Sequence, residues 1–202
     1  MTMSSALPAS IIKVDNTGGT HRTDDMLAVE EPLEIRIGFD DKGERIQKNI
    51  SVTMRTPGND FELATGFLFT EGIIKNAEEI LSIKHCNGIN ENVVRVELNE
   101  NVKVALNKLE RNFYTTSSCG VCGKSSIEAI KTVCHLPRTV SKTLYISAEV
   151  IYALPGLLRS RQDVFDFTGG LHGCGLFDDS GKLLLSREDV GRHNALDKLI
   201  GA

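Results

Sequence analysis

The sequence predicts a mixed chain of strands and helices, α+β or α/β in class. Two observations support this prediction. Apolar residues alternate at Leu33, Ile35 and Ile37, which is the period of a half-buried strand. Between residues 61 and 68 the apolar positions follow helical spacing instead. Because 41% of the 202 residues are hydrophobic, the chain can bury a core built from both kinds of element.

The N-terminal part of the chain is predicted to be a tail followed by a pair of strands. Residues 1–28 mix Ser, Thr, Gly and Asp without periodicity, so we expect a disordered tail. Alternation over 33–37 and again over 50–54 predicts two strands joined by a turn at Gly43. The β-rich part of the chain therefore begins after the tail.

A helix is expected next. The polar stretch 56–60 breaks the strand and offers caps, and Gly72 ends the helical pattern. The runs 93–98 and 102–106 then predict a second strand pair. We assign residues 29–112 to a small N-terminal α+β domain.

The following segment changes in composition. Residues 115–124 are almost entirely Thr, Ser, Gly and Cys, which predicts an exposed, mobile loop. Ser125 and Glu128 form a capping-box pattern that opens a helix. A further helix is expected to begin at Ser147 and to be bent or broken at Pro155.

The last elements are a hairpin and a helix. Turn-forming residues 178–181 lie between two apolar runs and predict the hairpin. The final helix should run over 190–200, with Asp189 as its cap. We assign residues 113–202 to a second domain, which carries the Cys-rich loop.

Charge and cysteine usage exclude several classes of protein. The formal net charge is −4, with both signs interspersed, so a nucleic-acid partner is not expected. The chain has no run of about 18 apolar residues and no signal-peptide pattern, which favours a cytoplasmic protein without a membrane segment. An odd number of cysteines without an export signal argues for thiol or metal chemistry over a disulfide framework. The five cysteines are Cys86, Cys119, Cys122, Cys134 and Cys174.

Cys119 and Cys122 form a C-x-x-C pair just before the predicted capped helix. A helix N-terminus lowers a thiol pKa and favours the nucleophilic thiolate, and Lys124 adds a cation close by. A flexible loop around such a thiol suits a residue that must accept a sulfur atom from one protein and pass it to another. The pattern is compatible with a sulfur carrier.

Two other interpretations of this pair stay open. A structural zinc site needs two more ligands, which His172 and Cys174 could supply. A thiol-disulfide redox protein also uses C-x-x-C, but the fit is loose because polar residues separate the pair from the helix. The sequence alone does not decide among these chemistries.

Five further residues are candidates for ligand contacts. Gly169 and Gly170 would let main-chain amides approach an anion, and His172 could act as an acid or base near the thiolate. Arg192 could meet a phosphate or carboxylate on the first turn of the last helix, and His193 lies at the edge of its apolar stripe. The alternative is a purely structural role, in which the two glycines form a tight turn and the two histidines make hydrogen bonds within the fold.

Together these segments resemble the FdhD/NarQ family over roughly residues 30–201. Their order and spacing make the resemblance specific. The stretches are Arg55 to Asp60 with Gly66 to Leu68 and Glu71 to Ile74; Cys119-Gly120-Val121-Cys122-Gly123; and Thr168 to His172 with Glu188 to Lys198.

The resemblance implies a sulfurtransferase that serves formate dehydrogenase. A cysteine desulfurase would load a persulfide, and the sulfur would pass to the molybdenum in bis(molybdopterin guanine dinucleotide). In this family the first loop cysteine carries the persulfide, which corresponds to Cys119, and Cys122 would assist. Gly169, Gly170, His172, Arg192 and His193 would then contact the cofactor.

The resemblance also implies a homodimer with a cytidine-deaminase-like α/β domain after the smaller N-terminal part. Deaminases bind zinc through H-x-E and P-C-x-x-C. Here His172-Gly173-Cys174 lacks the glutamate, so deamination is disfavoured and no tightly bound metal is expected. Family chains continue past the position of Gly201, so the second domain is expected to be C-terminally truncated.

Overall fold

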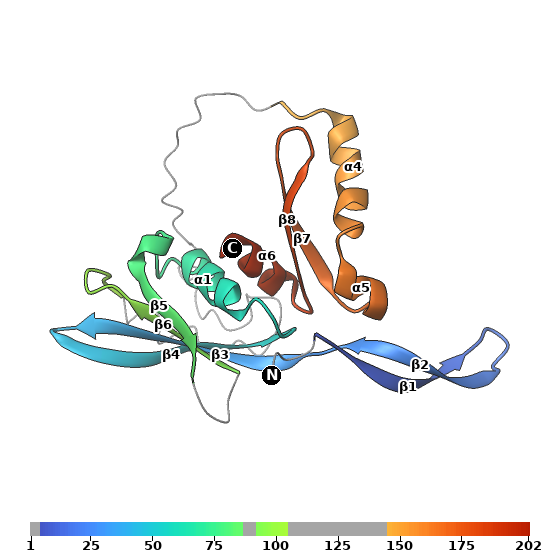
Figure 1. Cartoon of the computed structure of the whole chain (residues 1–202), viewed down its shortest axis with the longest axis horizontal. Coiled ribbons are helices and arrows are strands. Elements are labelled where there is room, and N and C mark those ends of the chain that lie inside the picture. The colour runs from blue at the N-terminus through green and yellow to red at the C-terminus, as the bar shows by residue number, and fades with distance from the viewer. Residues whose placement is uncertain (1–4, 87–91, 105–144) are drawn as a thin grey trace, which may run out of the picture.

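The structure is a computed structural model that describes residues 5–86, 92–104 and 145–202. It confirms a mixed α/β architecture (Figure 1). The strands are β1 Ala6–Val14, β2 Thr20–Ala28, β3 Glu31–Asp41, β4 Glu44–Arg55, β5 Ile80–His85, β6 Val93–Leu98, β7 His172–Phe177 and β8 Leu183–Asp189. The helices are α1 Asp60–Thr70, the 3-10 turn η1 Ala77–Glu79, α4 Ala148–Arg159, α5 Asp163–Thr168 and α6 Arg192–Ile200.

The central sheet has four strands in the order β4-β3-β6-β5. β3 pairs antiparallel with β4 and parallel with β6, and β5 pairs antiparallel with β6. The predicted hairpin across Gly43 is confirmed. Asp41 pairs with Glu44, and the two residues between them, Lys42 and Gly43, have φ 52° and 88°. Positive φ at both positions is the tight turn that matches the twist of the flanking strands.

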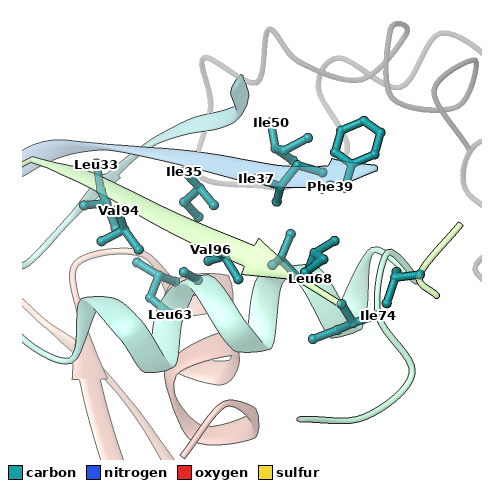
Figure 2. Packing of buried hydrophobic residues seen from close by; sticks show 13 residues of the cluster. Leu33, Ile35, Ile37, Phe39, Ile50, Leu63, Leu68, Ile74, Val94 and Val96 are labelled. Atoms are coloured by element: carbon teal, nitrogen blue, oxygen red, sulfur yellow. The ribbon is translucent and has the colours of Figure 1, made fainter. Parts of the chain in front are cut away.

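The hydrophobic core lies between this sheet and helix α1 (Figure 2). The predicted period-2 residues Leu33, Ile35 and Ile37 are fully buried on one face of β3. Leu63 and Leu68 of α1 are buried with them. The cluster consists of Leu33, Ile35, Ile37, Phe39, Ile50, Leu63, Ala64, Leu68, Ile74, Val94, Val96, Leu98 and Val102.

The second predicted strand pair is only half right. Val93–Leu98 is a strand, but residues 101–104 are not, and β6 pairs with β3 and β5 instead. The Val102 N–H donates to the Asn99 carbonyl in a turn, and the Val102 side chain packs into the core. The apolar character of Val102 therefore reflects burial and not strand pairing, while residues 105 and 106 of the predicted strand lie outside the described residues.

The N-terminal segment differs from the expected disordered tail. Residues 6–28 form an antiparallel two-stranded ribbon, β1 with β2, which projects from the rest of the molecule (Figure 1). At its tip the Asp15 carboxylate accepts hydrogen bonds from Thr17 N (2.8 Å) and Gly19 N (2.9 Å). This side-chain turn supplies the hairpin geometry that a composition-based prediction overlooks.

The C-terminal elements form a layer beside α1. Ser147 caps α4 as predicted, but the helix continues through Pro155 to Arg159 on an exposed surface. The hairpin around 178–181 is confirmed as β7 and β8. Helix α6 begins at Arg192 with Gly191 as its N-cap, so the predicted cap at Asp189 is wrong.

Helices α1 and α6 pack closely because glycines lie at their contact. A Cβ at Gly66 would overlap the main-chain carbonyl of Asp197, and one at Gly201 would overlap the carbonyl of Glu62. Backbone-to-backbone approach of this kind requires a residue without a side chain. None of the helices in the described ranges is long and apolar enough to cross a membrane.

Candidate functional site

Three of the predicted ligand-contact residues lie where α5 leads into β7. Gly169 ends α5 with φ 64°, and its N–H donates to the Phe165 carbonyl at 2.7 Å. The chain passes through Gly170 to His172, the first residue of β7. Because a Cβ is strained in the left-handed region, Gly169 has a structural reason to be glycine.

The other two, Arg192 and His193, open α6 at the same end of the β7–β8 hairpin. His172 pairs with Asp189 across the two antiparallel strands, and α6 begins just after that residue. The structure therefore brings the two predicted stretches together. All five residues are exposed. We call them the hairpin-edge surface, which consists of Gly169, Gly170, His172, Arg192 and His193.

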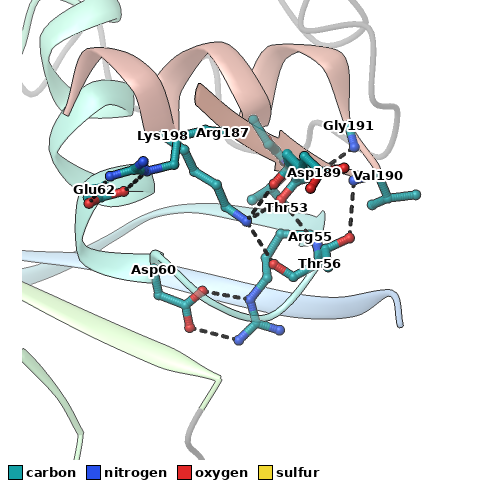
Figure 3. Close-up of polar contacts among 12 residues, drawn as sticks. Thr53, Arg55, Thr56, Asp60, Glu62, Arg187, Asp189, Val190, Gly191 and Lys198 are labelled. Carbon is teal, nitrogen blue, oxygen red and sulfur yellow. Dashed lines mark hydrogen bonds and ion pairs between the residues drawn. The ribbon is translucent and has the colours of Figure 1, made fainter. Parts of the chain in front are cut away.

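Beneath this surface the Asp189 carboxylate is completely buried (Figure 3). It accepts hydrogen bonds from Thr56 N (3.1 Å), Gly191 N (2.8 Å) and the Asn194 side-chain amide (3.1 Å). An ion pair with Lys198 Nζ at 2.7 Å completes the set. A buried carboxylate is tolerated only when it is matched in this way.

Lys198 is the cation of this buried network, with 1% of its surface exposed. Its ammonium also donates to the Thr56 carbonyl (2.8 Å) and the Glu188 carbonyl (3.4 Å). The ammonium group has three N–H donors, and three acceptors surround it. Lys198 thus fixes the end of β8 against the turn that follows β4.

Asn194 connects α6 to strand β4. Its amide donates to the Met54 carbonyl (2.7 Å), and its side-chain oxygen accepts from the Thr53 hydroxyl (3.2 Å). The Thr56 hydroxyl in turn accepts from Val190 N (3.1 Å). These contacts hold the first turn of α6 in place, and with it the adjacent exposed residues of the hairpin-edge surface.

A second buried ion pair organises the turn between β4 and α1. Arg55, with 0% exposure, donates to Asp60 through Nε (3.0 Å) and a terminal nitrogen (2.9 Å), and that nitrogen also donates to Asn92 Oδ1 (2.9 Å). The turn it closes contains Gly58 at φ 108° and Asn59 at φ 57°. A two-point guanidinium contact holds both orientation and distance.

Glu188 has a capping role. Its carboxylate accepts from Val164 N (3.0 Å) and Phe165 N (2.9 Å) in the first turn of α5. A carboxylate satisfies the otherwise unpaired amides at a helix start. Two adjacent acidic residues therefore fix two different elements, α5 through Glu188 and α6 through Asp189.

A cavity of about 350 Å³ lies next to the β4–α1 turn. Its cations are Arg161, Arg187 and Lys198. Arg187 is paired with Glu62, with a terminal nitrogen 2.7 Å from Oε1, and Lys198 is paired as above. Arg161 is therefore the exposed cation of this lining and the one that can reach a small polar group in the cavity. Its lining is Ser5, Thr56, Pro57, Gly58, Asn59, Arg161, Val164, Leu171, Ser186, Arg187, Glu188 and Lys198.

Comparison with known proteins decides the family. Residues 28–202 match the FdhD/NarQ family. The chain belongs to this family. The match confirms the resemblance seen in the sequence, and it begins at the last residue of β2, so nearly all of the N-terminal ribbon precedes it.

Relatives in the FdhD/NarQ family are similar along most of this chain. It is 50% identical to the sulfur carrier protein FdhD of Mycolicibacterium paratuberculosis over 181 residues, covering 87% of this chain and 63% of the relative. It is 44% identical to the sulfur carrier protein FdhD of Streptomyces coelicolor over 190 residues, covering 91% and 64%. The chain thus spans less than two thirds of the length of these relatives.

A solved structure is also similar. A protein from Desulfotalea psychrophila, described as a formate dehydrogenase accessory protein, matches with a TM-score of 0.62 and 25% identity. The match covers 98% of this chain and 68% of that chain. This similarity extends over the N-terminal ribbon as well as the part that matches the family.

Two of the stretches that carry the FdhD/NarQ resemblance meet in the buried network. Thr56 belongs to the first, and Asp189, Asn194 and Lys198 belong to the last. The sequence draws attention to Arg192 and His193 in that last stretch, but it misses the buried partners beside them. An acidic residue at the end of a strand and a lysine in the following helix are compatible with a buried ion pair. Whether the two side chains meet depends on the tertiary structure, which the sequence pattern does not give.

Of the five cysteines, Cys86 and Cys174 lie in the described part of the chain. Cys119 and Cys122 lie outside the described residues, as do Cys134 and the predicted capping box at Ser125. Cys174 is half-buried on β7, and burial raises the pKa of its thiol, which disfavours a thiolate there. Within the described ranges no three His, Cys, Asp or Glu side chains cluster as metal ligands.

Asp197 lies at the α1–α6 contact and is 9% exposed. Burial raises the pKa of its carboxyl to about 7, and the Glu71 charge adds to this, while a hydrogen bond from the Thr70 hydroxyl (3.0 Å) opposes it. Because the folded pKa lies above the unfolded value, the folded state holds a proton that the unfolded state releases between about pH 4 and pH 7. Stability should therefore fall as the pH rises through this range.

Replacing Asp197 with asparagine should remove this pH dependence. The Asn variant keeps an acceptor for Thr70 but carries no buried charge. We expect its free energy of unfolding at pH 8 to exceed that of the wild type by roughly 1–4 kcal/mol, and the two to converge near pH 3. Urea unfolding across this range measures it. Asp179→Asn, at an exposed position, is the control, and equal curves for wild type and Asp197→Asn would contradict the assignment.

Proposed function

We propose that this chain is a sulfur carrier that serves formate dehydrogenase, with Cys119 as the residue that holds the sulfur. The observation that carries the proposal is its 44–50% identity to proteins named sulfur carrier protein FdhD. The C-x-x-C pair in its Gly- and Ser-rich loop gives that activity a chemical group.

The proposed loading step is a thiol exchange. The Cys119 thiolate attacks the outer sulfur of a persulfide on a cysteine desulfurase, a new S–S bond forms, and the desulfurase cysteine leaves as a thiolate. For delivery, the Cys122 thiolate attacks the Cys119 sulfur. The outer sulfur then leaves as hydrosulfide, and Cys119 and Cys122 are left oxidised as a disulfide. A cellular dithiol reduces this disulfide and restores both thiols.

The proposed acceptor is the molybdenum of bis(molybdopterin guanine dinucleotide), which contacts the hairpin-edge surface. Arg192 and His193 are exposed there, on a helix turn fixed by the buried Asp189 network. Arginine suits the diphosphate oxygens of such a cofactor, because its planar group donates two parallel hydrogen bonds. The firm support beneath this turn keeps the donors oriented before the acceptor arrives.

Loading is tested by intact mass spectrometry after incubation with a cysteine desulfurase and cysteine. Wild type should gain one cyanide-labile sulfur atom, and Cys119→Ala should gain none. Cys174→Ala is the matched control and should load like wild type. A sulfur adduct that survives unchanged in Cys119→Ala would remove this residue from the mechanism. If the wild type instead binds zinc stoichiometrically and loses it when either Cys119 or Cys122 is replaced, a structural zinc site is favoured over a sulfur carrier.

Delivery is the second arm of the same experiment. Arg192→Ala should load sulfur normally but should activate sulfur-free formate dehydrogenase poorly, because it affects only the acceptor contact. Lys182→Ala, in the turn at the other end of the hairpin, is the control. If Arg192→Ala delivers sulfur as well as the control does, the hairpin-edge surface is not the acceptor site.

The remaining architecture is proposed from the family resemblance. We infer that residues 113–202 belong to a cytidine-deaminase-like α/β domain, that 29–112 form the N-terminal domain, and that the protein works as a cytoplasmic homodimer. The α1–α6 contact would then be an interface between the two domains. The close glycine packing there supports a fixed arrangement of the two parts.

A further inference from the structure

Two aspartates of the C-terminal layer are buried, but their surroundings differ. Asp189 is 0% exposed and Asp197 is 9% exposed. The Asp189 carboxylate accepts three hydrogen bonds and pairs with the Lys198 ammonium. The Asp197 carboxyl has one hydrogen-bond partner among the described residues, the Thr70 hydroxyl of α1, and no cation. A single neutral donor compensates a buried negative charge poorly, so the two aspartates should differ in protonation.

The Thr70 hydroxyl lies between two acceptors. Its oxygen is 3.0 Å from Asp197 Oδ1 and 3.2 Å from the Phe67 carbonyl oxygen. A hydroxyl has one hydrogen to donate and two lone pairs that accept. If Asp197 is ionised, Thr70 can donate to only one of the two. If Asp197 is protonated, its O–H donates to Thr70 and the Thr70 O–H donates to Phe67, so every hydrogen has an acceptor.

The charges around α6 do not stabilise an ionised Asp197. Arg187 is paired with Glu62, and Lys198 is paired with Asp189. Among the described residues, the charge that acts on the Asp197 carboxyl is that of Glu71, and together with burial it raises the pKa of this group. The titratable side chains on α6 and on the elements packed against it are Asp60, Glu62 and, directly after the helix, Glu71 on α1; His172 and Cys174 on β7; Arg187, Glu188 and Asp189 on β8; and Arg192, His193 and Lys198 on α6 itself.

The α1–α6 contact has little room to adapt to a charge. The two helices lie side by side in Figure 1, and a Cβ at Gly66 would overlap the carbonyl of Asp197 itself. Four residues on, a Cβ at Gly201 would overlap the Glu62 carbonyl. Main chain cannot turn aside as a side chain can, so water has no easy way in. An ionised Asp197 therefore reaches water only if the end of α6 moves away from α1.

We propose that the α1–α6 contact is a pH-sensitive switch. It is closed while Asp197 is protonated and donates a hydrogen bond to Thr70, and the C-terminal half of α6 opens locally from α1 when the proton passes to water. The switch does not depend on the proposed sulfur chemistry. Because α6 begins with Arg192 and His193, opening also changes the support of the hairpin-edge surface.

Infrared difference spectroscopy of the 202-residue chain tests the proton directly. An un-ionised carboxylic acid has a carbonyl band that a carboxylate lacks. Wild type should show at pH 6 a band that Asp197→Asn lacks, and this band should weaken as the pH rises through about 7. Asp179→Asn, at an exposed position, is the control and should keep the band. Identical spectra for wild type and Asp197→Asn at pH 6 would overturn the proposal.

Amide hydrogen exchange, corrected for its intrinsic pH dependence, tests the local opening. Protection of the α6 amides should fall roughly tenfold between pH 6 and pH 8, because above about pH 7 the closed state still has to lose its proton to open fully, whereas the open state is ionised throughout. The amides of β3 report global unfolding and should stay better protected than those of α6 at both pH values. Asp197→Asn should protect α6 equally at both, since its amide N–H still donates to Thr70.

Two Thr70 variants separate the hydrogen-bond chain from packing. Thr70→Val keeps the shape but has no hydroxyl, so the protection of α6 at pH 6 should fall roughly two- to tenfold. Thr70→Ser keeps the hydroxyl and should behave like wild type. Three results would each overturn the switch: α6 amides that exchange in step with those of β3, protection of α6 that is equal at pH 6 and pH 8 in the wild type, or a Thr70→Val variant that matches the wild type.

Discussion

Replacing Lys198 with methionine is expected to lower the free energy of unfolding by about 3–5 kcal/mol. Lys198 is 1% exposed, and its ammonium lies 2.7 Å from the buried Asp189 carboxylate. Methionine fills most of the same volume, so the loss comes mainly from a buried carboxylate left without its cation. The Thr56 and Glu188 carbonyls also lose their donor. Urea unfolding at neutral pH measures the change.

A double-mutant cycle separates this charge effect from packing. In the Lys198→Met, Asp189→Asn double variant the carboxylate is also removed, while the amide oxygen can still accept from Gly191 N. The double variant should therefore be much less destabilised than the sum of the two single variants. If the single Lys198→Met variant loses less than about 1 kcal/mol, the ion pair does not stabilise the fold as described.

Gly66→Ala should also be strongly destabilising, by about 1–3 kcal/mol, because the added methyl group overlaps the main chain of α6. The obstacle is the Asp197 carbonyl, which cannot rotate away as a side chain could. The two helices must separate, and this loosens the contact that joins the main sheet to the C-terminal layer. Denaturant unfolding followed by circular dichroism measures the loss.

Gly156→Ala in α4 is the matched control. It is also a glycine inside a helix, but nothing lies within 4 Å of the position that its Cβ would occupy. Alanine favours helix over glycine by about 0.5–1 kcal/mol, so this variant should be neutral or stabilised. Equal effects at the two glycines would show that helix propensity, and not close packing, governs position 66.

Much of the fold could be predicted where local periodicity and burial coincide. Leu33, Ile35 and Ile37 alternate because one face of β3 is covered by α1, and the Lys42-Gly43 turn is fixed by local geometry. The strand predicted to begin at Val102 is not found over the described residues 102–104, because Val102 is apolar for burial in the core and not for strand pairing. Short apolar runs do not distinguish these two causes.

The N-terminal ribbon was missed for a different reason. Its residues Ile11, Ile12 and Val14 favour strands, but polar and small residues around them mask the alternation. The Asp15 turn is a readable signal, since an acidic side chain before Thr17 and Gly19 can accept main-chain hydrogen bonds from both. Small and polar residues around a strand do not by themselves indicate disorder when a side-chain turn of this kind lies between two strand-forming runs.

The candidate site was predicted in part. The exposed residues His172, Arg192 and His193 could be named from sequence, and the structure places them at one end of a hairpin. The buried pair of Asp189 and Lys198 could not, because nothing local brings a strand end and a helix face onto the turn at Thr56. The role of Cys119 stays a prediction, since it lies outside the described residues.

The contact between α1 and α6 also has a consequence during synthesis. Helix α1 is complete when the ribosome has added Thr70, whereas α6 ends only at Ile200. At about 5–20 residues per second, roughly 6–25 s pass before the second helix emerges to cover the first. For that interval the surface of α1 around Gly66, which α6 covers in the complete fold, has no partner helix to pack against.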